Sequence, residues 1–285
     1  MGRPGFVERT ARSGLYLAAA LMALFLAVLL VWLVRDTARL LAAVGVVPVA
    51  LGLSFTPLAG HYGLLPFAWG SAVVGAVALA ASVPLGIGFA VAVTKRLPTW
   101  AGSGLTSGMT AVVAVPSVIW GWWGLATVVP WLRGATGGPG FSLLAAGVTA
   151  AVMVVPTVAA LAAGALGQVA PELEDASRAL GATEDQTLWA VTMRAAQPGL
   201  VQASLMGLGR AVAETMAVAM VVGGQAVARI QVQWPGSTLT TGILGNMAAW
   251  PPDSPGGQAV GAMALVLLIG TWWLLRQLHR VGATP

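Results

Sequence analysis

The chain has 285 residues, of which 58% are hydrophobic and only 8% are charged, with 37 Gly, 17 Pro and no Cys. Soluble domains carry about 25% charged residues, so this composition indicates an integral membrane protein. The net charge of +5 does not indicate nucleic-acid binding, because the cations are scattered between apolar runs rather than gathered in a patch. Without Cys, and with His61 and His279 far apart, we predict no catalytic, metal or cofactor site.

Six apolar runs are long enough to cross a bilayer as helices, which takes about 20 residues each. In chain order they are residues 15–34, 64–94, 105–130, 141–166, 200–222 and 259–275. The first run follows Arg3, Arg9 and Arg12 and is longer than the ~7–15 apolar residues of a signal peptide. We therefore interpret it as an uncleaved span and predict an all-α membrane protein with six helices.

The distribution of Lys and Arg predicts the orientation, because cytoplasmic loops carry an excess of both. With six spans and a cytoplasmic N-terminus, nine cations lie inside and four outside. This arrangement places residues 1–14 and 277–285 in the cytoplasm and residues 35–63 in an extracytoplasmic or interfacial segment. Residues 40–56 are also apolar, and counting them as a seventh span reverses the N-terminus and gives a weaker bias of eight to five. Both arrangements place residues 167–199 in the cytoplasm.

Two further residue types mark the runs. Pro84, Pro116 and Pro156 lie inside them and predict kinks, because proline removes a helical hydrogen bond. Tryptophans near the ends of the runs, such as Trp69 and Trp272, are typical of contact with lipid at the membrane interface.

Residues 167–199, called the 167–199 loop below, form the one long polar segment between two runs and hold five of the nine acidic residues. Pro171 suits the first position of a helix, and Gly181 suits a left-handed helix end. Thr183 with Gln186 three residues later forms a capping box for a second helix, which should end before Pro198. The loop is therefore predicted to be a helix, a glycine turn and a second helix.

The sequence of this loop resembles the EAA loop of ATP-binding cassette (ABC) importer permeases, which have Glu-Ala-Ala, three further residues and Gly. Asp175, Ala176 and Ser177 stand at the Glu-Ala-Ala positions, and Gly181 is the glycine. The resemblance implies that these residues couple the permease to a cytoplasmic ATPase. The family's usual Leu-Pro pair after the second helix is replaced here by Met193-Arg194. The chain itself lacks the G-x-x-x-x-G-K-[ST] phosphate loop, so ATP hydrolysis is expected in a separate subunit.

Arg210 and Glu214 are the only formally charged residues within the six runs. Burying either charge costs about 2.5–3.5 kcal/mol on insertion scales, which makes the pair a candidate functional site. Their i, i+4 spacing predicts contact on one helix face. The pair either locks the bundle or lets Glu214 orient Arg210 toward an anion, which the planar guanidinium can bind bidentately.

The stretch Gly207–Met216 resembles the Gly-x-x-Arg-Ala-x-x-Glu-Thr-Met segment of phosphate-specific ABC permeases. Residues 62–71 and the Val-Pro-Ser-Val-Ile-Trp-Gly stretch at residues 115–121 resemble further segments of that family, so the likeness covers roughly residues 62–275. It is nearer to the PstC-type permease than to its PstA-type partner. The resemblance implies a type I permease domain over residues 64–276 and a substrate pathway with Arg210, Glu214, Thr215 and Ser117.

The same resemblance implies a heterodimer with a PstA-like permease, two copies of the ATPase and an extracytoplasmic phosphate-binding protein, all in a prokaryotic cell membrane. Three alternatives stay open. The substrate can be another oxyanion, such as sulfate, molybdate or phosphonate. The chain can also be a proton-coupled secondary transporter with Glu214 as its proton site. The third is an anchor that recruits a partner through the 167–199 loop and transports nothing.

Overall fold

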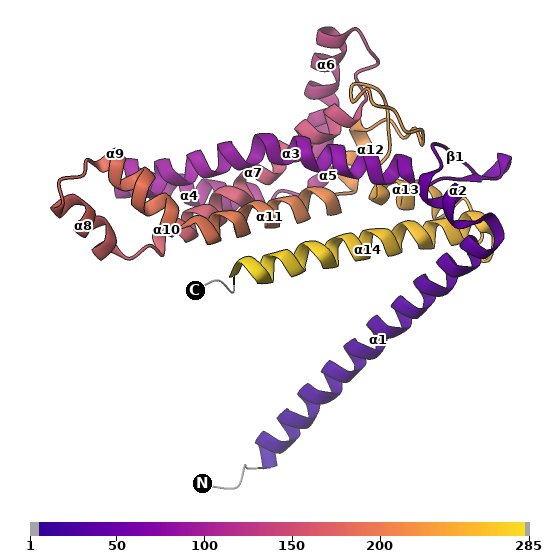
Figure 1. Cartoon of the computed structure of the whole chain (residues 1–285), viewed down its shortest axis with the longest axis horizontal. Helices are drawn as coiled ribbons and strands as arrows, with labels where there is room; N and C mark the ends of the chain where they lie inside the picture. The colour runs from indigo at the N-terminus through magenta and orange to yellow at the C-terminus, as the bar shows by residue number, and fades with distance from the viewer. Residues whose placement is uncertain (1–5, 283–285) are drawn as a thin grey trace.

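A computed structural model describes residues 6–282, and these residues are helical apart from one short hairpin and the connecting loops (Figure 1). Four described helices are long and apolar enough to cross a membrane, and they match the first, second, fourth and sixth predicted runs. They are α1 (Phe6–Val44), α3 (Leu65–Val91), α7 (Leu143–Gly167) and α14 (Pro255–Gly282). Pro84 and Pro156 lie inside α3 and α7, which continue through them.

The third run, predicted over residues 105–130, is a bent pair of helical segments rather than one helix. It begins with α4 (Thr99–Val113) and continues through α5 (Ser117–Trp123), the π-helical turn η3 (Gly124–Val128) and α6 (Val129–Thr136). The two segments, Thr99–Val113 and Ser117–Thr136, meet at 92°. Pro116 lies at the bend, where it removes a backbone donor and disfavours helical geometry at the residue before it.

The fifth run, predicted over residues 200–222, is also broken. Helix α11 (Gln197–Ala213) stops at Glu214, whose ψ of 130° is extended, and α12 (Met216–Val221) follows. Backbone groups freed inside a membrane must find partners within the protein. Here the Glu214 carboxylate accepts a hydrogen bond from the Ala217 N–H at 3.1 Å. The Glu214 carbonyl accepts one from the Thr240 hydroxyl at 2.9 Å. These two bonds satisfy two backbone groups at a break that contains neither proline nor glycine.

Helix α1 extends ten residues beyond the predicted end of its run, and the segment after it does not form a seventh span. Helix α2 (Val46–Leu51) has six residues, about 9 Å of rise, against the ~30 Å of a bilayer core. A two-stranded antiparallel hairpin follows, with β1 (Phe55–Thr56) paired to β2 (His61–Tyr62) around the short helical turn η1 (Pro57–Ala59). Phe55 packs edge-on against Phe67 of α3, so this segment closes one end of the bundle.

The core lies around α7, most of whose apolar length is buried, and α3 and α11 pack against it (Figure 1). Small residues bring the helices close together. A Cβ on Gly86 of α3 would lie 2.8 Å from Val158 of α7, and one on Gly207 of α11 would lie 2.7 Å from the same valine. Helix α14 packs on α11, while α1 meets α14 at one end and diverges from it at the other (Figure 1). Most large apolar side chains of α1 between Leu15 and Val31 are consequently exposed in the single chain.

The remaining helices are short and connect the long ones. Between α7 and α11 the 167–199 loop forms α8 (Pro171–Ala179), α9 (Glu184–Thr187), the π-helical turn η4 (Leu188–Thr192) and α10 (Met193–Ala195). The second predicted helix of this loop is therefore three short pieces, and it ends before Pro198 as expected. At the opposite end of the bundle, α13 (Leu239–Asn246) leads into α14 (Figure 1).

Candidate functional site: a helical loop and a broken helix

The local features predicted for the 167–199 loop are confirmed. Helix α8 begins at Pro171, and Gly181 follows its end with a φ of +87°, which L side chains rarely adopt. The Thr183 N–H donates to Gln186 Oε1 at 2.9 Å, and the Gln186 N–H donates to Thr183 Oγ1 at 3.3 Å, which completes the capping box. A Cβ on Gly181 would meet no atom within 4 Å, so the turn needs the glycine for its backbone angle and not for space.

The residues aligned with the EAA motif lie on α8. Asp175 and Ala176 are exposed, and Asp175 pairs with Arg178 of the same helix at 3.3 Å. Ser177 is half-buried, and its Oγ lies 3.0 Å from Thr187 Oγ1, which joins α8 to α9. Beyond α8, Leu180 is 90% exposed, and Trp189 of η4 is exposed as well.

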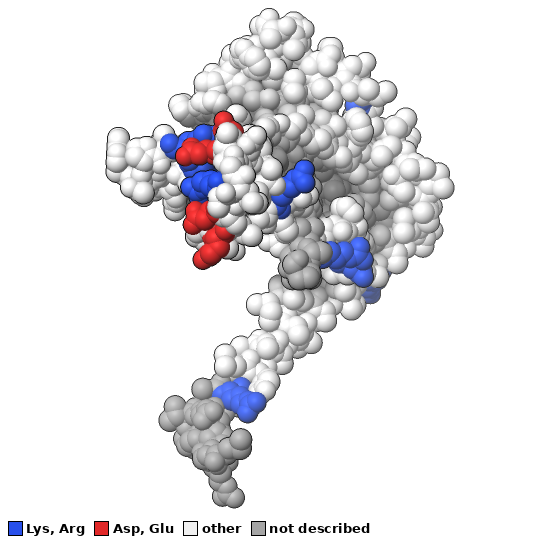
Figure 2. All heavy atoms as spheres, turned by 60° about the vertical axis from the view of Figure 1, so that its left-hand side comes forward, with Lys and Arg blue, Asp and Glu red and all other residues white. Residues whose placement is uncertain are grey.

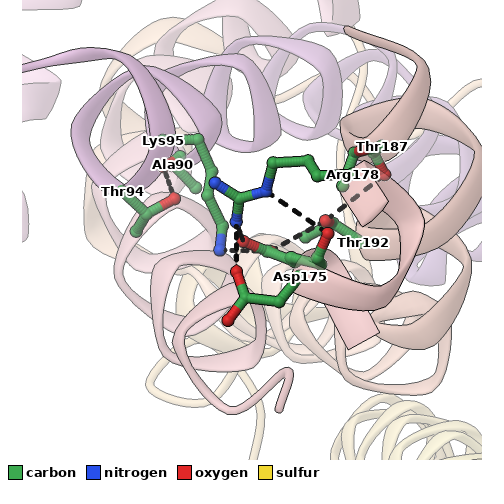
Figure 3. A network of polar contacts seen from close by, with 8 residues as sticks. Ala90, Thr94, Lys95, Asp175, Arg178, Thr187 and Thr192 are labelled. Carbon is green, nitrogen blue, oxygen red and sulfur yellow. Dashed lines mark hydrogen bonds and ion pairs between the residues drawn. The ribbon is translucent and has the colours of Figure 1, made fainter. Parts of the chain in front are cut away.

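The structure also places residues at this loop that the sequence reasoning missed. The turn η2 (Ala92–Arg96) ends α3 and carries Lys95, the single lysine of the chain, whose Nζ lies 2.6 Å from Glu174 Oε1. Thr192 donates to the same oxygen at 2.8 Å, and Arg96 pairs with Asp185 of α9. Figure 3 shows Lys95, Arg178 and Thr192 converging on this point from separate elements. The sequence signal that could have found this contact is the Lys95-Arg96 pair directly after the second run.

Opposing effects act on the pKa of the Glu174 carboxyl. Burial by itself raises the pKa of its carboxyl. Hydrogen bonds from Lys95 and Thr192, together with the charges of Lys95 and Arg178, outweigh burial and hold the pKa below its ordinary value. The carboxylate is therefore ionised at neutral pH. On the face shown in Figure 2, the acidic side chains gather with cations in one cluster, while the other visible cations are dispersed.

The predicted contact between Arg210 and Glu214 is wrong. Among the described residues no ion pair or hydrogen bond joins them, although Glu214 caps α11 with a φ of −68° that is still helical. Glu214 instead accepts a hydrogen bond from the start of α12. Arg210 is half-buried in the last turn of α11, and its buried Nε has no hydrogen-bond partner within residues 6–282.

The other two predicted pathway residues flank the broken segments. Thr215 lies in the break between α11 and α12. Ser117 begins α5, which packs tightly on α12, since a Cβ on Gly121 would lie 2.8 Å from the Cα of Ala217. Within the described part of the chain, no hydrogen bond links Ser117 to Arg210, Glu214 or Thr215. The structure thus brings the two broken runs together without joining their polar side chains.

Buried threonines beside the break were also missed. Thr240 of α13 donates to the Glu214 carbonyl, and its Oγ1 lies 3.0 Å from Thr238 Oγ1. Thr238 caps α13 together with Thr241. Five consecutive residues from Ser237 to Thr241 contain four hydroxyls, a signal that was visible but had no predicted partner.

These features define a class of protein: a helical membrane protein with a charged helical loop at one end, two broken segments in its interior and, beside one break, a guanidinium N–H that is unpaired among the described residues. Among residues 6–282 no group of His, Asp or Glu is placed to hold a metal ion. The family model of the binding-protein-dependent transport system inner membrane component matches residues 82–280. The chain belongs to this family, the permeases of ABC importers.

Curated relatives and a solved structure support this assignment. The chain is 36% identical to the "Probable ABC transporter permease protein YqgH" of Bacillus subtilis (strain 168), over 73% of this chain and 68% of the relative. It is 27% identical to the "Phosphate transport system permease protein PstC" of Xylella fastidiosa (strain Temecula1), over 67% of this chain and 65% of that protein. The chain thus spans about two thirds of the length of these relatives.

The fold is similar to that of a chain of the MetNI methionine ABC transporter in inward-facing conformations, with a TM-score of 0.56 and 22% identity. The match covers 77% of this chain and 92% of that one. The predicted all-α fold of an ABC importer permease is therefore confirmed, as is the resemblance to the PstC-type permeases.

Proposed function

We propose that this permease forms part of the membrane pathway for inorganic phosphate. The observation that carries the proposal is Arg210, whose guanidinium Nε is buried beside a break in a membrane helix and has no partner among the described residues. An unpaired buried donor is unfavourable unless a ligand or a partner chain satisfies it. An oxyanion satisfies it with charge-assisted hydrogen bonds.

The choice of phosphate over other oxyanions rests on the likeness to proteins named as phosphate transport permeases, such as the PstC of Xylella fastidiosa. The residues around the pathway do not add a selective contact, because Ser117, Thr215 and Arg210 offer donors to any tetrahedral oxyanion. Specificity can also reside in the binding protein that delivers the substrate.

The proposed assembly has separate subunits for ATP hydrolysis, delivery and the second half of the pathway. A cytoplasmic ATPase dimer docks on the 167–199 loop, where the exposed Leu180 and Trp189 provide apolar contacts and Asp175, Ala176, Ser177 and Gly181 shape the surface. A PstA-like permease completes the pathway, and an extracytoplasmic binding protein delivers phosphate. Both termini of this chain are then cytoplasmic, in agreement with the charge bias.

Uptake of radiolabelled phosphate in cells lacking only this chain tests the proposal. We expect uptake to fall, to return when the gene is restored, and to fall equally when the ATPase subunit is deleted instead. Competition with unlabelled sulfate, molybdate and phosphonate in the same cells separates the oxyanions. Uptake that survives loss of the ATPase would contradict the proposal and favour proton coupling. Transport of sulfate or molybdate in place of phosphate would contradict the substrate.

A further inference from the structure

The end of α3 is bonded to both helical parts of the 167–199 loop, although the chain positions are far apart. Lys95 reaches Glu174 on α8, a separation of 79 residues, and Arg96 reaches Asp185 on α9, a separation of 89 residues. The backbone itself attaches this loop to α7 at one end and to α11 at the other. The two ion pairs therefore add a third attachment, to α3.

The Lys95–Glu174 contact differs from an ordinary surface pair in its burial. The side chains of Lys95 and Glu174 are 22% and 15% exposed. Arg39 and Asp253, by contrast, are 44% and 99% exposed and lie 4.0 Å apart. Exposed pairs contribute about 0–1 kcal/mol and hold little in place. The Glu174 carboxylate also accepts a hydrogen bond from the hydroxyl of Thr192, which is buried. Contacts from two elements therefore fix the position of the carboxylate.

Helix α3 is well placed to carry movement from this contact into the bundle. It packs along α7, where Gly86 lies against Val158 and Val77 lies against Gly147. It also packs on α11, the helix that carries Arg210. Close-packed helices move as units because their interfaces do not deform continuously.

We propose that Lys95 is a positioning residue that fastens the 167–199 loop to α3, so that displacement of the loop by the ATPase moves α3 together with α7 and α11. This inference rests on the proposed function, because it requires an ATPase that acts on the loop. The Lys95–Glu174 contact stays closed through the transport cycle and serves as a fixed link. Loss of the link leaves ATP hydrolysis intact and reduces the phosphate moved per ATP.

A charge-swap series on the complete reconstituted complex, with both permeases, the ATPase and the binding protein, tests the link. Lys95→Glu places two carboxylates together, and we expect the ratio of phosphate transported to ATP hydrolysed to fall at least tenfold while hydrolysis continues. The double variant Lys95→Glu with Glu174→Lys restores opposite charges and should recover the ratio to within about threefold of wild type. Arg276→Glu makes the same charge reversal at the end of α14 and should leave the ratio unchanged. A normal ratio in Lys95→Glu, or a swap no better than the single variant, would overturn the proposal.

A cross-linking experiment distinguishes a Lys95–Glu174 contact that stays closed during transport from one that must open. The chain has no cysteine, so Lys95→Cys with Glu174→Cys can be bridged selectively by a short bifunctional thiol reagent in a complex whose other subunits are also free of cysteine. We expect bridging to restore the transport ratio that the unbridged double variant has lost. Arrest of transport by the bridge would overturn the fixed link. Wild-type complex that moves no phosphate with ATP would instead refute the proposed function, so the two failures are distinguishable.

Discussion

Glu174 of the 167–199 loop and Arg210 of the broken fifth run differ in whether the chain itself supplies their bonding partners. In the loop, Glu174 is bound by Lys95, Thr192 and Arg178. In the broken run, a buried N–H of Arg210 has no partner in the part of the chain that the structure describes, and the nearby Glu214 carboxylate is bonded to the backbone of α12. A charge that is fully bonded within its own chain holds parts of that chain together. A charge that the fold leaves open has bonding capacity for a ligand or another subunit.

The sharpest test of this comparison is substitution of Arg210, which we expect to have the largest effect on phosphate uptake. Arg210→Lys keeps the charge and loses the bidentate fork, so phosphate uptake normalised to membrane abundance should fall roughly 10–100-fold. This range follows from the ~1.5–3 kcal/mol of a hydrogen bond to a charged group, with 1.4 kcal/mol for each factor of ten. Arg276→Lys, at the end of α14, should transport normally. Full uptake in Arg210→Ala, or in Arg210→Glu with Glu214→Arg, would remove Arg210 from the pathway.

The glycine turn of the loop provides the next largest effect. Gly181→Val forces a β-branched side chain into a φ of +87°, at roughly 1–3 kcal/mol, so the turn should distort and transport should fall about tenfold with the protein still in the membrane. Gly181→Asn is the matched variant, because asparagine tolerates left-handed backbone and should retain most activity. Uptake of labelled phosphate and immunoblots of membranes measure both. Equal activity in the two variants would show that the turn is not needed for coupling.

Substitutions of Glu214 test whether the break in the fifth run depends on the hydrogen bond from the Ala217 N–H to the Glu214 carboxylate. Glu214→Ala removes the acceptor for the Ala217 N–H and should lower the free energy of unfolding by about 1 kcal/mol, the usual value of a helix cap. Glu214→Gln keeps an acceptor oxygen and should lose less. Thermal unfolding of the purified complex in detergent compares the two. If Gln destabilises as much as Ala, the negative charge matters more than the hydrogen bond.

The smallest expected effect is a pH dependence of stability that comes from Glu174. Its pKa is lower in the folded protein, so the carboxylate stabilises the fold fully above its ordinary value of about 4.5. That stabilisation disappears as the pH falls through the lowered pKa of the folded state. The difference in melting temperature between wild type and Glu174→Gln should therefore be largest near neutral pH and shrink below about pH 4.5. A difference that grows with acidification would reverse the assigned direction.

Much of the loop was predictable because its determinants are local. Pro171, Gly181 and the Thr183–Gln186 box act on the backbone within a few residues of themselves, so their pattern predicts helix starts and ends directly. The span count was less accurate. Hydropathy locates apolar segments, but a broken pair such as α11 and α12 has the same composition as one continuous helix.

The amino-acid sequence alone determined the membrane class, the apolar runs, the helical loop and the motifs of the permease family, since these follow from composition and short-range spacing. The tertiary structure decided which partners the charged groups have. Glu214 does not pair with Arg210 because it is bonded at the break instead. Its carboxylate accepts from the Ala217 N–H, and its carbonyl accepts from Thr240, which lies 26 residues further along the chain. Lys95 meets Glu174 because the turn η2 after α3 and the first turn of α8 lie at the same end of the bundle. Contacts between distant residues depend on helix packing, and spacing along one chain does not contain that information.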